Sequence, residues 1–153
     1  MVKVKILAIA GSPRKGGNSE LIAKEALKAA EALGDVTTEF ISLAGKNIGP
    51  CDDCRRCQIE GSIDNICPSV KDDAQDIYRK MMDADGIIIA APVYWGGVPA
   101  QLRALIDRSM AIEFLGLPLR NKIGGTVITA GGKNGGQETA TISLHHWFQI
   151  HDM

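Results

Sequence analysis

This sequence has few aromatic residues, no long apolar run and no excess of charge of either sign. Aromatic side chains make up 5% of the 153 residues, and 17 basic residues are balanced by 18 acidic ones. The even charge leaves no basic surface for nucleic acid, so we expect no DNA or RNA partner. No run approaches the roughly 18 apolar residues of a membrane helix, and the chain opens on a strand pattern rather than a signal segment. We therefore expect a cytoplasmic protein without a membrane partner.

Cysteine is absent from most of the chain, because all four cysteines lie between residues 51 and 67. This confinement excludes a disulfide framework spread over the fold and favours a metal or cluster site in a reducing compartment. A hydrophobic content of 45% is enough for one sizeable core. We expect residues 1–153 to form a single domain, with the cysteine segment as an insertion at residues 45–70.

The chain begins with a strand pattern from Val2 to Ala10, which becomes continuously apolar as a strand buried on both faces would. A glycine-rich stretch at residues 11–19 follows, and then a helix pattern that Asn18 or Ser19 is suited to cap and Gly34 to end. The apolar stripe that we predict for this helix consists of Leu21, Ile22, Ala26, Ala29, Ala30 and Leu33.

The stretch at residues 11–19 is typical of a phosphate-binding loop, since free N–H groups and the positive dipole end of a helix meet there. The lysine of a Walker A motif is missing, and position 13 is proline where a dinucleotide motif has glycine. One terminal monophosphate is therefore the favoured ligand, and an ordinary strand-to-helix turn is the alternative. The candidate binding residues are Ser12, Pro13, Arg14, Gly17, Asn18 and Ser19.

Strand and helix patterns alternate along the rest of the chain. We predict strands at residues 36–43, 87–91 and 123–130, the first of them at an edge. Predicted helices cover residues 70–82, the stretch after Pro99, and the C-terminal stretch with Leu144, Trp147 and Phe148 inward. This alternation predicts a parallel α/β sheet with ligands at the carboxyl ends of its strands.

Two further loops would flank the same ligand. Tyr94 and Trp95 offer a flat ring something to lie against, and nearby glycines let backbone amides approach its polar edge. The alternative is that both aromatic residues belong to the core. The candidate residues are Pro92, Val93, Tyr94, Trp95, Gly96, Gly97, Ala130, Gly131 and Gly132.

The last helix pattern reaches Met153 with no strand after it. A flavodoxin-like sheet of order 2-1-3-4-5 needs a fifth strand and helix, without which the strand at 123–130 would be a long apolar edge. We therefore expect the sequence to be part of a longer chain, with exchange of elements between protomers as the alternative.

The cysteine segment contains Cys51, Cys54, Cys57 and Cys67, a C-x2-C-x2-C-x9-C spacing. Three thiolates at successive gaps of two residues, completed by a fourth, are typical of a [4Fe-4S] site. Structural zinc, which prefers two separated C-x2-C pairs, is the second alternative, and free or redox-active thiols are the third. Arg55 and Arg56 would steer an acidic partner such as a ferredoxin unless they form an ordinary solvated charge run.

Together these motifs resemble the iron-sulfur flavoproteins, a branch of the flavodoxin-like NAD(P)H-dependent FMN reductases. The resemblance rests on Gly11-Ser-Pro-Arg with Gly17-Asn-Ser, the cysteine motif followed by Asp72-Asp, Ala84-Asp-Gly-Ile-Ile with Pro92-Val-Tyr, and Gly135-Gly-Gln-Glu. It implies a three-layer flavodoxin-like sandwich in which the first loop holds the FMN phosphate and the later loops hold the ribityl chain and the flavin ring. It also implies that the four cysteines hold a [4Fe-4S] cluster, and that a dimer or tetramer brings the cluster of one protomer to the flavin of another. Two departures are the long gap before Cys67 and the missing last strand and helix.

The function implied by the resemblance is an FMN-dependent oxidoreductase that passes electrons between the cluster and FMN, with NAD(P)H or a ferredoxin as donor. No catalytic side chain of its own is required or visible. One alternative is an NAD(P)H-dependent FMN or quinone reductase with zinc or nothing at the cysteines, and another is a non-enzymatic redox carrier or metal-stabilised binding module. Because the cysteine segment follows the second strand, we expect the cluster beside the flavin.

Overall fold

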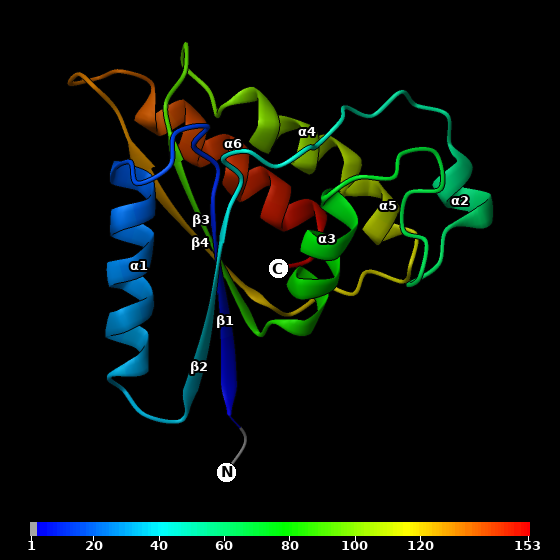
Figure 1. The fold of residues 1–153 in the computed structure, drawn as a ribbon, viewed down its shortest axis with the longest axis horizontal. Helices are drawn as coiled ribbons and strands as arrows, with labels where there is room; N and C mark the ends of the chain where they lie inside the picture. The colour runs from blue at the N-terminus through cyan, green and yellow to red at the C-terminus, as the bar shows by residue number, and fades with distance from the viewer. Residues whose placement is uncertain (1–2) are drawn as a thin grey trace.

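The computed structural model describes residues 3–153, which contain a four-stranded parallel sheet (Figure 1). Its strands are β1 (Val4–Ala10), β2 (Val36–Ser42), β3 (Gly86–Pro92) and β4 (Ile123–Thr129), in the order β2-β1-β3-β4. The parallel α/β class, the first four places of the expected order and the edge position of β2 are confirmed. Val2, where we predicted the first strand to begin, lies outside the described residues.

The helices form the outer layers of an α/β/α sandwich, unequally divided between the two faces of the sheet (Figure 1). One helix packs on the face formed by Ala8 and Ala90, and the remaining long helices pack on the face formed by Leu7, Ile9 and Ile87. The helices are α1 (Asn18–Glu31), alone on its face among the described elements, and α2 (Arg56–Glu60), α3 (Ala74–Asp83), α4 (Ala100–Arg108), α5 (Met110–Glu113) and α6 (Gln137–Ile150).

The predicted apolar stripe of the first helix is wrong. Leu21 is 56% exposed and Leu33 is 84% exposed, whereas two polar residues of the first turn are buried. Those two residues are buried because they hydrogen-bond to strand ends far along the chain, which a hydrophobicity pattern cannot register. The buried side chains of α1 are Ser19, Glu20, Ala23 and Leu27.

The predicted helix at residues 70–82 begins at Ala74, four residues late. The carboxylate of Asp72 accepts a hydrogen bond from the Ala74 N–H at 3.0 Å, so the chain turns before the helix starts. The predicted inward face of the final helix is confirmed, since Leu144, Trp147 and Phe148 of α6 are all buried, but the helix ends at Ile150 and does not reach Met153.

The carboxyl ends of β1, β3 and β4 lie at one edge of the sheet, at the top of Figure 1. Pairing continues just past two of these ends, from Gly11 N to Ala90 O at 2.7 Å and from Val93 N to Thr129 O at 2.8 Å. A side chain on Gly11 would meet Leu102 of α4 at 2.6 Å, so glycine is needed where β1 leaves the sheet. Three loops are thereby held next to one another.

At its far side the sheet ends with β4, and residues 3–153 contain no fifth strand. Ile123 at the start of β4 is 77% exposed, and a mainly apolar hollow of about 590 Å³ extends over the beginnings of β3 and β4 on the α1 side. None of the helices within residues 3–153 has the length and apolarity to cross a membrane.

Candidate functional site

A hollow of about 280 Å³, here called the phosphate hollow, lies where β1, β3 and β4 end. It brings together three segments that are about 40 to 80 residues apart in the sequence, as ligand sites of open parallel sheets do. Its lining consists of Ser12, Arg14, Gly17, Asn18, Ser19, Pro92, Val93, Tyr94, Thr129, Ala130 and Gly131.

The first turn of α1 supplies the anion-binding character of this hollow. Gly17 is the N-cap residue, and no side chain caps the helix, so the predicted capping by Asn18 or Ser19 is wrong. The first N–H groups of α1 remain available to a ligand, at the positive end of the helix dipole. A side chain on Gly17 would meet the Arg14 guanidinium at 3.2 Å, so glycine leaves room for that positive charge.

Glu20 holds the loop in shape, and sequence reasoning missed it. Its buried carboxylate accepts hydrogen bonds from Ser42 Oγ at 2.5 Å and Gly16 N at 3.0 Å. The bond from Ser42 in particular lowers the pKa of Glu20 against the opposing effect of burial. Its position three residues after the N-cap, where a capping box has glutamate, is a signal that could have identified it.

Thr129 is a second residue that sequence reasoning missed. Its Oγ1 lies 3.2 Å from Ser19 Oγ, so the end of β4 is tied to the first turn of α1 across the hollow. The available signal was its position near the carboxyl end of the strand predicted at residues 123–130.

The aromatic pair predicted for the flat ring lies in a tight turn rather than in the core. Tyr94 and Gly97 exchange two backbone hydrogen bonds of 2.9 and 3.1 Å around Trp95 and Gly96, whose φ angles are 49° and 81°. This is the pattern of a type I′ turn, which a bulky residue adopts at a cost in backbone strain. Trp95 is fully exposed and Tyr94 is 49% exposed, so the core alternative is wrong for both.

The start of α6 holds this turn in place. Thr139 Oγ1 donates to Gly96 O at 2.7 Å, and a side chain on Gly136 would meet the Gly96 backbone at 2.7 Å. The predicted residues that do not line the hollow are Trp95, Gly96 and Gly97 in this turn, and Pro13 and Gly132 beside lining residues.

The four cysteines also meet at one place, a second hollow of about 20 Å³ here called the thiol hollow. Cys54 Sγ lies 2.7 Å from Ser69 Oγ, and burial together with neighbouring thiols raises the pKa of Cys57. Within residues 3–153, no three side chains of His, Cys, Asp or Glu are close enough to hold one metal ion. The four thiols of a four-thiolate site therefore line one hollow, but their sulfur atoms are not close enough together to bind one metal ion. The lining is Cys51, Asp52, Cys54, Arg55, Cys57, Cys67, Ser69, Val70, Arg108, Met110 and Ala111.

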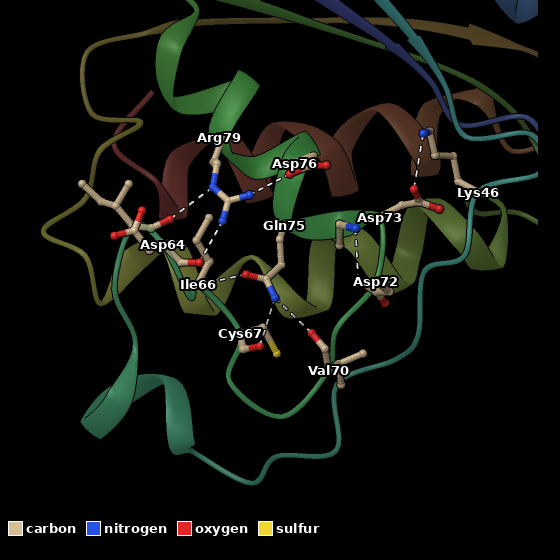
Figure 2. Close-up of polar contacts among 12 residues, drawn as sticks. Lys46, Asp64, Ile66, Cys67, Val70, Asp72, Asp73, Gln75, Asp76 and Arg79 are labelled. Carbon is tan, nitrogen blue, oxygen red and sulfur yellow. Dashed lines mark hydrogen bonds and ion pairs between the residues drawn. The ribbon is translucent and has the colours of Figure 1, made fainter.

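Gln75 of α3 fastens the turn that carries Cys67, as Figure 2 shows. Its side-chain oxygen accepts from Ile66 N at 3.1 Å, and its nitrogen donates to Cys67 O at 3.5 Å and Val70 O at 3.4 Å. Gln75 is 7% exposed. No sequence pattern pointed to it, because its partners are loop carbonyl and amide groups.

A buried ion pair lies behind the same segment. Arg108 donates to Asp72 Oδ2 at 2.5 Å, and both side chains are at most 2% exposed. Burial alone would raise the pKa of Asp72, but hydrogen bonds from Arg108, Gly49 N and Ala74 N outweigh it and lower that pKa. Sequence reasoning missed Arg108 altogether, because an arginine in an amphipathic helix pattern reads as a surface residue.

The charges next to the cysteines are paired within the segment. Arg55 lies 3.4 Å from Asp53, and Arg56 lies 2.6 Å from Glu60. All four side chains are about half exposed or more, as in an ordinary solvated charge run.

The structure does not bring the two hollows together within one chain. No residue lines both, and Figure 1 shows α2 on the opposite side of the molecule from α1. β2 ends at the same edge of the sheet as β1, but the chain then runs away from that edge toward α2 (Figure 1). The expectation that a cluster lies beside the phosphate ligand is thus wrong for a single chain.

Comparison with known proteins gives consistent relationships. The sequence model of the family described as NADPH-dependent FMN reductase matches residues 4–153. An iron-sulfur flavoprotein of Methanocaldococcus jannaschii is 48% identical over 98% of this chain and 74% of its own length, and one of Methanosarcina thermophila is 43% identical over 98% and 75%. The solved structure of a WrbA-like flavodoxin from Agrobacterium tumefaciens, at 17% identity, superposes with a TM-score of 0.64 over 98% of this chain and 74% of its own.

Proposed function

Because the chain belongs to the NADPH-dependent FMN reductase family, it is an FMN-dependent oxidoreductase, and we propose that it passes electrons between a [4Fe-4S] cluster and FMN. The observation that carries the proposal is the meeting of all four cysteines at one hollow. Two relatives that are 43–48% identical are named iron-sulfur flavoproteins, which supports the same assignment.

The phosphate hollow provides groups suited to FMN. Arg14, Ser12 and the free N–H groups at the start of α1 would bind the phosphate. Tyr94 would pack against the flavin ring, and Gly131 would allow a backbone amide to approach the ring edge. Bound FMN exchanges one or two electrons, so it links single-electron carriers to two-electron donors. The protein's part is to bind and orient the flavin.

The thiol hollow suits a thiolate-bound cluster in its donor set. Four sulfur ligands, with no His among the lining residues, match the ligation of a [4Fe-4S] cluster. Binding of the cluster would bring the four sulfur atoms together, as in other sites that form only when their metal binds.

We further propose a homo-oligomer in which the thiol hollow of one protomer faces the phosphate hollow of another. The separation of the two hollows within one chain supports this arrangement. Sedimentation of the FMN-loaded protein tests it, since a monomer at the concentration where electron transfer is measured would contradict it.

A second candidate is an NAD(P)H-dependent FMN or quinone reductase that carries no cluster. It is favoured by the absence, within residues 3–153, of three metal ligands at bonding distance from a common point. In this case the cysteine segment would be a structural insertion or a zinc site.

The visible spectrum of anaerobically purified protein, before and after dithionite, separates the two candidates. Flavin bands on a broad iron-thiolate absorption, both bleached by reduction, are expected. Flavin bands alone, with no iron after reconstitution, would favour the second candidate, and zinc analysis would then define the cysteine site. A protein that takes up neither FMN nor iron would contradict both.

A further inference from the structure

The cysteine segment, defined here as residues 50–69, is fastened at both of its ends by the Arg108–Asp72 ion pair. On the entry side, Gly49 N donates to Asp72 Oδ2 at 2.7 Å, and Arg108 donates to Gly49 O at 3.1 Å. On the exit side, Arg108 donates to Val70 O at 3.5 Å, and Asp72 follows two residues later. One pair of side chains thus joins the two ends of a twenty-residue segment to the end of α4.

A buried pair of this kind is costly to build, because each charge loses its water. Asp72 repays part of this cost by accepting hydrogen bonds from Gly49 N, Ala74 N and Arg108. Arg108 reaches a carboxylate and two carbonyl groups at once through its planar fork, which the single ammonium group of lysine would not reproduce.

One nitrogen of Arg108 forms no hydrogen bond within residues 3–153. Its Nε is buried and has no hydrogen-bond partner among the described residues, although an unpaired buried donor is normally unfavourable. Arg108 also lines the thiol hollow, together with all four cysteines. A side chain that is 2% exposed therefore keeps a free N–H and a fixed positive charge at the place where four sulfur ligands gather.

We propose that Arg108 and Asp72 are positioning residues for the cluster ligands, with the free N–H of Arg108 donating to a ligand sulfur once the cluster is bound. The inference rests on the proposed function, because it concerns the cluster that the cysteines would hold. The Arg108–Asp72 ion pair, here called the clamp, sets the separation of the two ends of the cysteine segment. The hydrogen bond and the positive charge stabilise the more negative, reduced cluster.

Arg108→Lys tests the proposal with the least disturbance, because it keeps the charge and loses the fork. Arg103→Lys is the matched control, since Arg103 lies on the same helix, is exposed and contacts Asp107 rather than the cysteine segment. Three quantities are measured on the whole protein: hydrogen exchange of residues 50–69 without the cluster, iron per chain after anaerobic reconstitution, and the cluster midpoint potential by EPR titration.

For Arg108→Lys we expect exchange in residues 50–69 to be faster by about tenfold, as local opening becomes easier. We also expect less iron per chain and a lower midpoint potential, because a ligand sulfur loses a hydrogen bond. Arg103→Lys should match the wild type in all three. A purely structural role for Arg108 would change exchange and iron content but not the potential of the cluster that remains.

Two results separate failure of this inference from failure of the proposed function. If the wild type binds the cluster and Arg108→Lys equals Arg103→Lys in exchange and potential, the inference alone is overturned. If the wild type takes up no iron, the proposed function fails. Should Arg108→Lys not fold, Asp72→Asn provides the second variant, and unchanged exchange of residues 50–69 in it would overturn the clamp.

Discussion

The phosphate hollow and the thiol hollow are built in opposite ways. The first is made of strand ends, a helix start and backbone amides, and three separate loops are held by the sheet that they leave. The second belongs to one long segment that is fastened at its ends and at the Cys67 turn. The first hollow has a defined shape without a ligand, whereas the thiols of the second line a hollow without reaching ligation distance.

This difference indicates how each cofactor would be acquired. A preformed site loses little entropy on binding, so FMN would enter a protein that is already folded. A site whose ligands must be drawn together couples binding to local ordering, so the cluster would complete the cysteine segment. Damage to one hollow should therefore leave the other intact.

The largest effect should come from removing a sulfur ligand. We expect Cys67→Ser to lower iron per chain at least about tenfold, because three thiolates do not complete a four-thiolate site. FMN content should stay unchanged, since Cys67 does not line the phosphate hollow. Iron and flavin are quantified on the same sample. Ser62→Ala, at an exposed residue of the same segment that does not line the thiol hollow, is the control, and joint loss of both cofactors would show that the two sites are coupled.

Arg14→Met should weaken FMN binding at the phosphate hollow and leave the thiol hollow unchanged. Loss of a charged hydrogen bond to phosphate typically costs about 1.5 to 3 kcal/mol, so we expect FMN affinity to fall about 10- to 100-fold. Fluorescence titration of the apoprotein with FMN measures this loss. Lys15→Met is the control, because Lys15 is the adjacent basic residue but does not line the hollow. Equal losses in both variants would mean that only overall charge matters.

Acid should loosen the cysteine segment through Asp72. The folded protein lowers the pKa of this carboxyl below its ordinary value of 3.8, so the stabilisation is complete above 3.8 and is lost as the pH falls through the lowered value. The free energy of unfolding in urea, measured at pH values above and below 3.8, should show this loss. In Asp72→Asn the free energy of unfolding should depend less on pH over the same range. Asp76→Asn is the control at an exposed carboxyl. An identical pH slope in the wild type and Asp72→Asn would contradict the prediction.

The smallest effect concerns strain beside the phosphate hollow. Asparagine tolerates the positive φ of 49° at position 95 better than tryptophan, so Trp95→Asn should stabilise the apoprotein by about 1 kcal/mol. The same change should leave FMN affinity unchanged, because Trp95 does not line the phosphate hollow. Thermal unfolding and FMN titration measure the two effects. Trp95→Phe keeps the strain and should give no gain in stability, and a less stable Trp95→Asn protein would refute the strain.

Local patterns in the sequence were sufficient for the framework. The periodicities of strands and helices predicted β1, β3 and β4 within a few residues, because burial on a regular element repeats at a fixed spacing. The same patterns failed on α1, whose inner face includes Ser19 and Glu20. These polar residues are buried because Thr129 and Ser42 satisfy them, and neither partner is near in the sequence.

The sequence by itself determined the parallel sheet, the loop at the start of α1 and the four sulfur donors, because each depends on residue type and short spacing. Only the tertiary structure decided that Thr129 completes the phosphate hollow, that Arg108 and Gln75 support the thiol hollow, and that the two hollows lie apart. Contacts of this kind join residues tens of positions apart, and their geometry arises from the packing of whole helices against the sheet.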